Sequence, residues 1–194
     1  EDIRHLLEVN SDIVVVVDEA YVDFGAESAI TLLSEYSNLL VVQTCSKSRG
    51  LAGMRIGLAL GSVDLIEALI RMKDSFNSYP LDKLAQVGAA AAFGDTAYFD
   101  KTRNKVIATR ESFRARILMA GYDVVPSKAN FLLVRHPFLN GADFAHQLRL
   151  RGILVRHLSG EKLLLYVRIS IGTDEQMDHV VEVFLNLISQ LNDG

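Results

Sequence analysis

Two short apolar runs, each closed by polar residues, most constrain how this chain can fold. The first run covers residues 13–17 and ends at Asp18. The second covers residues 39–43 and is followed by Lys47. Short apolar runs of this kind predict strands buried on both faces, as in parallel α/β sheets. Because the ends of parallel strands lie side by side, we expect Asp18 and Lys47 at one edge, where open α/β sheets bind ligands.

The composition is that of a globular protein with a substantial core. Hydrophobic residues make up 49% of the 194 residues, and the formal net charge is −4. An acidic chain has no electrostatic reason to bind nucleic acid or an anionic membrane, and no apolar run approaches the roughly 20 residues that span a bilayer. The single cysteine, Cys45, fits a reducing cytosol, and the histidines lack metal-ligand spacing. We therefore expect a cytoplasmic protein without a metal, a membrane or a nucleic-acid partner.

The hydrophobic periodicity predicts two domains of different character. The predicted strands cover residues 13–17, 39–43, 56–60, 122–125, 130–135 and 163–169. The predicted helices cover residues 27–36, 62–72, 81–93, 95–120, 141–151 and a last segment opened by the capping box at 173–176. We expect a mostly parallel α/β domain over 1–120 and a smaller α+β domain over 121–194.

The long helix predicted over 95–120 is rich in lysine and arginine. It could suggest contact with nucleic acid, but no aromatic residues are interleaved with its basic ones. We interpret it as a solvated helix that links the two domains.

The stretch VVVVDEAY places an acid, Asp18, at the end of the first strand. One interpretation is the Walker B aspartate of a P-loop ATPase, although the G-x-x-x-x-G-K-[ST] loop that this needs does not occur in the sequence. A second is an aspartate that pairs with a protonated ring nitrogen of a cofactor. A third is an acid that caps a neighbouring loop. The stretch alone leaves all three open.

The stretch TCSKSRGLAGMR places Lys47 just after the second strand. A partly desolvated lysine amine is a good nucleophile for a carbonyl. The hydroxyls of Thr44, Ser46 and Ser48 and the planar cation of Arg55 suit a phosphate group. Together these groups suit an aldehyde that carries a phosphate, as pyridoxal phosphate does; a turn with a solvated lysine is the alternative.

Asp18 and Lys47 are more informative together than apart. They close two consecutive predicted strands, whose ends lie side by side in a parallel sheet. An acid for the pyridine nitrogen and a lysine for the aldehyde are two requirements of a pyridoxal-phosphate site.

These elements resemble those of the fold-type-I pyridoxal-phosphate aminotransferases, and within that family the histidinol-phosphate branch is most similar. The matching elements, in the family's order, are DEAY at 18–21, Ser46-Lys47, GLAGMR at 50–55 and RISIG at 168–172. The resemblance covers nearly the whole chain. It implies the C-terminal part of the large-domain sheet over 1–120 and the small domain over 121–194.

The resemblance implies a role for each cofactor-binding residue. Lys47 would hold the cofactor aldehyde and later shuttle the proton. Asp18 would pair with the pyridine nitrogen, and Tyr21 would donate to the ring's phenolic oxygen. Ser46 and Arg55 would bind the cofactor phosphate, with Thr44 as a further candidate.

The resemblance also implies a substrate and a reaction. Arg168 would bind the carboxylate or phosphate of the substrate, assisted by Arg156. The implied reaction is amino transfer from L-histidinol phosphate to 2-oxoglutarate, catalysed by a homodimer. A threonine-phosphate-type decarboxylase and an aromatic aminotransferase share this scaffold and remain alternatives.

The chain departs from the family pattern at two points. Many members have an aromatic residue where Arg49 stands, so Arg49 either alters the edge of the site or is solvated. The family's upstream half, with its N-P-x-N-P-x-G loop, does not occur in the sequence. We therefore expect the chain to be the C-terminal portion of a longer enzyme. A non-catalytic fragment that binds the cofactor poorly is a further hypothesis.

Overall fold

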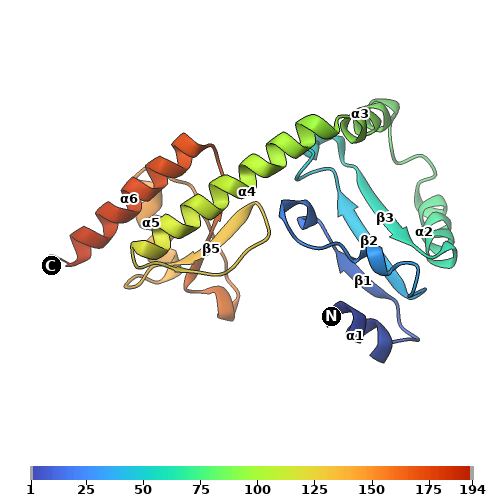
Figure 1. Cartoon of the computed structure of the whole chain (residues 1–194), viewed down its shortest axis with the longest axis horizontal. Helices are drawn as coiled ribbons and strands as arrows, with labels where there is room; N and C mark the ends of the chain where they lie inside the picture. The colour runs from blue at the N-terminus through green and yellow to red at the C-terminus, as the bar shows by residue number, and fades with distance from the viewer. Residues whose placement is uncertain (1, 193–194) are drawn as a thin grey trace. The chain divides into compact units, whose positions relative to one another are not determined.

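The computed structural model describes residues 2–192, which form two compact units, one up to Lys101 and one from Thr102 (Figure 1). The boundary lies within helix α4 (Thr96–Met119), whereas the sequence places it after residue 120. The physical reason is that Phe113 and Ile117 of α4 are buried in the core of the second unit.

The first unit contains a three-stranded sheet in the order β1-β2-β3. The strands are β1 (Val15–Asp18), β2 (Leu39–Thr44) and β3 (Gly57–Gly61). As predicted, β1 and β2 are parallel, and Asp18 pairs with Val42. Strand β3 runs antiparallel to β2 because their connection contains turns and a short 3₁₀ helix, not the α-helix that a parallel crossover usually uses.

Burial differs between the two parallel strands. Residues Leu39–Val41 of β2 are buried, as predicted for a strand covered on both faces. The same prediction is wrong for β1, because Val16 is 56% exposed. Val15 and Val17 point to the other face and pack in a core that includes Leu7. One face of β1 is therefore covered in this chain and the other is open.

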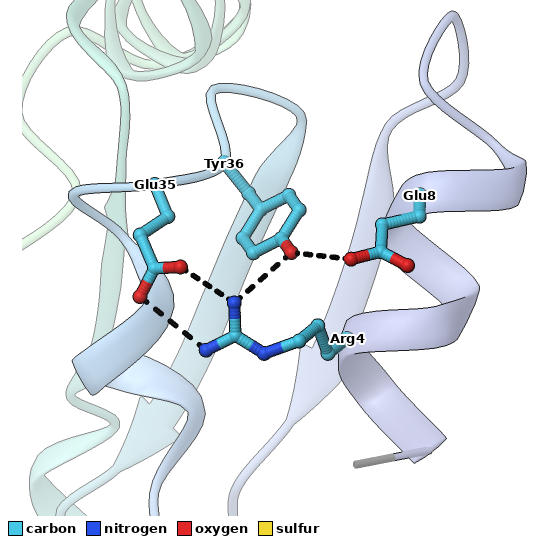
Figure 2. Close-up of polar contacts among 4 residues, drawn as sticks. All are labelled: Arg4, Glu8, Glu35 and Tyr36. Atoms are coloured by element: carbon cyan, nitrogen blue, oxygen red, sulfur yellow. Dashed lines mark hydrogen bonds and ion pairs between the residues drawn. The ribbon is translucent and has the colours of Figure 1, made fainter.

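Helix α1 (Asp2–Val9) is attached to the rest of the first unit by a polar cluster (Figure 2). The Arg4 guanidinium donates to Glu35 Oε2 over 2.5 Å and to the Tyr36 hydroxyl over 3.2 Å. The Tyr36 hydroxyl in turn donates to Glu8 Oε1 over 3.0 Å. Hydrogen bonding to Arg4 lowers the pKa of Glu35 below its ordinary value. With buried Leu7, this cluster fixes α1 against the segment before β2.

The remaining elements of the first unit are short 3₁₀ helices and two α-helices. They are η1 (Val22–Phe24), η2 (Ala29–Leu32), η3 (Ala52–Met54), α2 (Val63–Phe76) and α3 (Lys83–Gly94). The helix predicted over 27–36 is reduced to η2, whose first turn is capped by the Ser28 hydroxyl. Ser62 precedes α2 as predicted, but its hydroxyl donates to the Ser37 carbonyl instead of capping the helix.

The second unit contains a four-stranded antiparallel sheet in the order β4-β5-β7-β6, with helices. Its elements after α4 are β4 (Asp123–Val124), β5 (Phe131–Arg135), α5 (Gly141–Leu150), β6 (Arg156–His157), η4 (Glu161–Leu163), β7 (Tyr166–Ser170) and α6 (Asp174–Asn192). The strand predicted over 163–169 begins later, at Tyr166, because residues 161–163 form η4. The predicted capping box opens α6, since Thr173 N–H donates to Gln176 Oε1 and Gln176 N–H to Thr173 Oγ1.

Alternate residues of the central strands β5 and β7 face a hydrophobic core. Leu132 and Val134 of β5 and Val167 and Ile169 of β7 are buried with side chains of α4, α5 and α6. The intervening residues of both strands lie on the opposite face of the sheet and are only partly covered or exposed. The second unit therefore has one packed sheet face and one open face.

The sequence predicts that the basic helix α4 is solvated, but the structure shows that part of it is buried. The Arg110 side chain is 1% exposed and donates to the Ala129 carbonyl over 2.8 Å. It also pairs with Glu111 at 2.8 Å, while Arg116 pairs with Asp178 of α6. The prediction fails because α4 packs along the second unit. Within residues 2–192, no helix is both long and apolar enough to cross a membrane.

Candidate active site

The strand ends of the first unit meet at one edge of its sheet. Strand β1 ends at Asp18, parallel β2 ends three residues before Lys47, and antiparallel β3 begins beside the end of β2, with Thr44 opposite Gly57. Arg55 comes two residues before Gly57 and so lies at the same edge. The chain thus leaves the sheet after β2, carries the lysine, and returns with the arginine.

Lys47 and Tyr21 are brought together at this edge. The Lys47 Nζ lies 5.3 Å from the centroid of the Tyr21 ring, within the range of a cation–π interaction. The Lys47 side chain is exposed, and its amine makes no hydrogen bond or ion pair with any other residue in the range 2–192. Its amine is therefore positioned by an aromatic ring but is accessible to a ligand.

Asp18 has one committed and one uncommitted carboxylate oxygen. Its Oδ1 accepts a hydrogen bond from Ala20 N–H over 2.9 Å, so it caps the loop that leads to Tyr21. Within the described part of the chain, Oδ2 has no hydrogen-bond partner. The loop-capping interpretation and a ligand-binding role are therefore compatible.

Glu19 is a supporting residue that the sequence interpretation missed. Its carboxylate is buried and accepts from Ala29 N–H (2.5 Å), Ser28 Oγ (2.7 Å) and Gln43 Nε2 (2.9 Å). These bonds close the loop that carries Tyr21 against β2. Strand alternation could have indicated this role, because the residue after Asp18 must point to the opposite face.

The hydroxyls around Lys47 are mostly used within the loop. Thr44 Oγ1 donates to the Ile56 carbonyl and accepts from Ser46 N–H, and Ser48 Oγ donates to Asp23. Half-buried Ser46 is the exception, since its hydroxyl has no partner among residues 2–192. Of the three hydroxyls, Ser46 is best placed to bind a ligand.

Arg55 has an unusual backbone conformation. Among residues 2–192 it is the one non-glycine residue with positive φ, at φ 55° and ψ 43°. This left-handed conformation is uncommon for a residue with a Cβ, and such strain is often found at functional sites. The exposed side chain donates to the Ala52 carbonyl over 2.9 Å, which leaves most of its donors for a ligand.

The second unit brings together the two other predicted arginines, Arg156 and Arg168. They are direct cross-strand partners on β6 and β7, so both side chains lie on the open face of the sheet. Arg168 is half-buried, with Cζ 5.1 Å from the centroid of the Phe131 ring, and its Nε is buried without a partner among the described residues. Neither guanidinium forms an ion pair within residues 2–192. Two like charges therefore face each other without a carboxylate between them.

The predicted site residues thus form two groups, one in each unit. The first group is Asp18, Tyr21, Ser46, Lys47 and Arg55. The second is Arg156 and Arg168. Among residues 2–192, no cluster of three or more His, Cys, Asp or Glu side chains could hold a metal ion.

In the first unit Asp18 ends β1 and Lys47 follows parallel β2 by three residues, and the second unit is a small α+β unit with an arginine pair. The sequence matches the model of the family "Aminotransferase class I and II" over residues 1–184. The chain belongs to this family, and the Walker B interpretation of VVVVDE is therefore wrong.

Individual relatives refine this assignment. The chain is 54% identical over 187 residues to histidinol-phosphate aminotransferase of Acetobacter pasteurianus, which covers 96% of this chain and 52% of that protein. The crystal structure of the Sinorhizobium meliloti histidinol-phosphate aminotransferase in complex with pyridoxal-5'-phosphate has a TM-score of 0.80 at 25% identity, covering 97% of this chain and 53% of that one. The Clostridium acetobutylicum enzyme has a TM-score of 0.86 at 20% identity, covering 96% and 58%.

These comparisons confirm the predicted fold class and the resemblance to the histidinol-phosphate branch. The chain spans about half the length of the curated relatives that it matches.

Proposed function

We propose that this chain carries the lysine-bearing part of a pyridoxal-phosphate-dependent aminotransferase. The proposed reaction moves the amine of L-histidinol phosphate to 2-oxoglutarate and so serves histidine biosynthesis. The observation that carries the proposal is the strand edge, where the exposed Lys47 amine lies over the Tyr21 ring and Asp18 ends the adjacent strand. The family match and the identity to histidinol-phosphate aminotransferases support it.

The residues at this edge fit pyridoxal phosphate by their chemistry. A primary amine at Lys47 suits the aldehyde, and the uncommitted carboxylate oxygen of Asp18 suits a protonated ring nitrogen. The Tyr21 hydroxyl suits the ring's phenolic oxygen. The Ser46 hydroxyl and the Arg55 guanidinium suit the phosphate. When bound, this cofactor supplies an electron sink for charge at the substrate α-carbon.

The chain's own side chains would then hold and move protons. Lys47 Nζ would take the proton from the substrate α-carbon and return it one position away, which is general acid–base catalysis by a mobile amine. Asp18 would stabilise the positive charge on the cofactor's ring nitrogen throughout. Glu19 would keep the Tyr21 loop closed through its three hydrogen bonds.

Arg156 and Arg168 would bind the anionic end of each substrate. Directly opposed like charges on neighbouring strands are destabilising, and a bound dianion would remove that repulsion. Guanidinium groups bind phosphate and carboxylate in the same bidentate way. One arginine pair could therefore bind the phosphate of the amino donor and, in the second half-reaction, a carboxylate of 2-oxoglutarate.

We also propose that the intact protein is a cytoplasmic homodimer. Large apolar side chains of the α2–α3 region are exposed, including Phe76 at 93%, Tyr79 at 92% and Leu84 at 78%. Clustered exposed apolar residues of this size mark surfaces that other protein covers. Sedimentation of the purified protein would test the proposal, and a monomer at micromolar concentration would overturn it.

Identifying the residue that reacts with pyridoxal phosphate tests the cofactor assignment. The protein is incubated with pyridoxal phosphate, reduced with borohydride, and mapped by peptide mass spectrometry. We expect the pyridoxyl group on Lys47, no label there in Lys47→Arg, and unchanged labelling in Lys73→Arg, a matched control on α2. A pyridoxyl group on another lysine would overturn the assignment.

Turnover with different donors tests the reaction. We expect glutamate to form from L-histidinol phosphate and 2-oxoglutarate. Carbon dioxide release from threonine phosphate without a keto acid would instead identify a decarboxylase. Preferred turnover of tyrosine or phenylalanine would identify an aromatic aminotransferase.

A further inference from the structure

Arg49, two residues after Lys47, lies against two aromatic rings. Its Cζ lies 4.0 Å from the centroid of the Phe93 ring and 4.0 Å from that of the Phe99 ring. Its Nη1 donates to the Ala92 carbonyl over 2.6 Å. Of the two alternatives that the sequence left open, solvation of Arg49 is therefore wrong. The side chain attaches the lysine loop to the end of α3 and the start of α4.

The chemistry of this contact requires arginine. A guanidinium is planar and weakly hydrated, so it can lie against aromatic rings while its N–H groups donate hydrogen bonds. A lysine ammonium is a compact, strongly hydrated point charge and cannot reproduce both contacts. Partial desolvation between two rings strengthens a cation–π interaction relative to an exposed one.

The other side of Lys47 is anchored as well. Cys45, two residues before it, is buried in a small core with Ile56 and Ala85. The Leu51 N–H returns to the Cys45 carbonyl over 2.9 Å, and the Gly50 N–H bonds the Lys47 carbonyl over 3.1 Å. Lys47 therefore lies in a turn with one anchor two residues before it and the other two residues after it.

We propose that Arg49 is a positioning residue for Lys47, and this inference rests on the proposed function of that lysine. The clamp of Arg49 between Phe93 and Phe99 fixes the backbone of residues 46–51, so that the Lys47 amine stays over the Tyr21 ring. Loss of the clamp loosens the turn without unfolding it, because Cys45 and the Ser48–Asp23 hydrogen bond remain. Arg49 acts through the turn and touches no reacting atom.

Hydrogen exchange tests the clamp without any cofactor. In Arg49→Lys and Arg49→Met, we expect the Gly50 and Leu51 amides to exchange at least tenfold faster than in the wild type. Phe99→Leu removes one ring and should give a smaller increase in the same two amides. Arg71→Lys, an exposed position on α2, serves as the matched control. Unchanged protection of both amides in Arg49→Lys and Phe99→Leu would overturn the proposal.

Labelling then tests the effect on Lys47. With pyridoxal phosphate and borohydride, we expect the labelling rate at Lys47 to fall at least tenfold in Arg49→Lys but not in Arg71→Lys. The pH midpoint of the bound cofactor's absorbance should also shift in Arg49→Lys alone, which a general loss of stability would not cause. Wild-type protein that never labels Lys47 would refute the proposed function, and the exchange data would still decide whether Arg49 holds the turn. Faster exchange of the Gly50 and Leu51 amides in Arg49→Lys, with unchanged labelling of Lys47 and an unchanged pH midpoint, would refute the positioning role.

Discussion

The strand edge of the first unit and the open sheet face of the second unit handle charge in opposite ways. At the edge, each charged side chain has a partner within the chain: Asp18 accepts from Ala20, and Lys47 lies over Tyr21. On the open face, Arg156 and Arg168 are cross-strand neighbours, and neither pairs with a carboxylate of the described residues. The edge is thus organised before any ligand arrives. The arginine pair needs an anion to offset its repulsion.

The strongest test of this contrast is Arg168→Gln. Loss of a charge-assisted hydrogen bond costs about 1.5–3 kcal/mol, so we expect kcat/KM for the phosphorylated donor to fall about 10- to 100-fold. The fold should be no less stable than in the wild type, because one of two opposed charges is removed. Steady-state kinetics and thermal unfolding would measure the two effects. Arg135→Gln is the control, because Arg135 pairs with Asp123. Equal kinetic losses in both variants would contradict the anion-binding role.

At the strand edge of the first unit we expect an effect on stability instead. Glu19→Gln tests the hydrogen bonds that hold the Tyr21 loop there. A neutral amide cannot accept all three hydrogen bonds that the carboxylate accepts, and its NH₂ group would face other donors. A buried group left unsatisfied costs about 1–3 kcal/mol, so we expect the free energy of unfolding to fall by that amount. Denaturant unfolding would measure it. The interpretation fails if Glu19→Gln is as stable as the wild type.

Stability of the second unit should depend on pH through His136. Its buried Nδ1 accepts from the Phe138 and Leu139 N–H groups, so the neutral ring carries its proton on Nε2. Burial lowers the pKa of His136 below its ordinary value of 6.5. The unfolded chain therefore binds the proton first, so stability is complete above pH 6.5 and falls as the pH drops below it, by up to about 1.4 kcal/mol per pH unit.

Unfolding measured between pH 5 and pH 8 would show this dependence. His136→Gln should be less stable at neutral pH but should lose this part of the slope. His179→Gln, at an exposed position on α6, is the control and should keep it. A slope that survives unchanged in His136→Gln would assign the pH dependence to other groups.

The smallest stability effect is expected at Arg55. Glycine adopts positive φ without strain, but it also raises the entropy of the unfolded chain, and the two effects roughly cancel. We expect Arg55→Gly to change the free energy of unfolding by less than about 0.5 kcal/mol while cofactor affinity falls about tenfold or more. Thermal unfolding and a pyridoxal-phosphate titration would separate these effects. Unchanged cofactor affinity would show that Arg55 does not bind the cofactor.

The sequence was sufficient to predict the parallel pairing of β1 and β2, because two short apolar runs that end in polar residues predict adjacent strands. It also identified the α6 capping box, which is a local pattern. It did not predict the roles of Glu19, Arg49 or Arg110. A buried charge depends on partners far along the chain, such as Ala29 for Glu19 and Ala129 for Arg110.

The exposed face of β1 shows a second kind of difficulty. A run of valines predicts a strand that is covered on both sides, but coverage is a property of what packs against the strand. In this chain only the face with Val15 and Val17 is covered.

That open face has a consequence for handling the chain on its own. Strand β1 lies at the edge of the described sheet, is rich in valine, and carries no lysine or proline that would discourage pairing. Exposed edge strands that are rich in β-branched residues are templates for intermolecular sheets and aggregation, and Asp18 is the one charged residue of β1. We therefore expect the chain to associate through this strand at high concentration, and Val16→Lys to reduce that association by placing a charge on the open face.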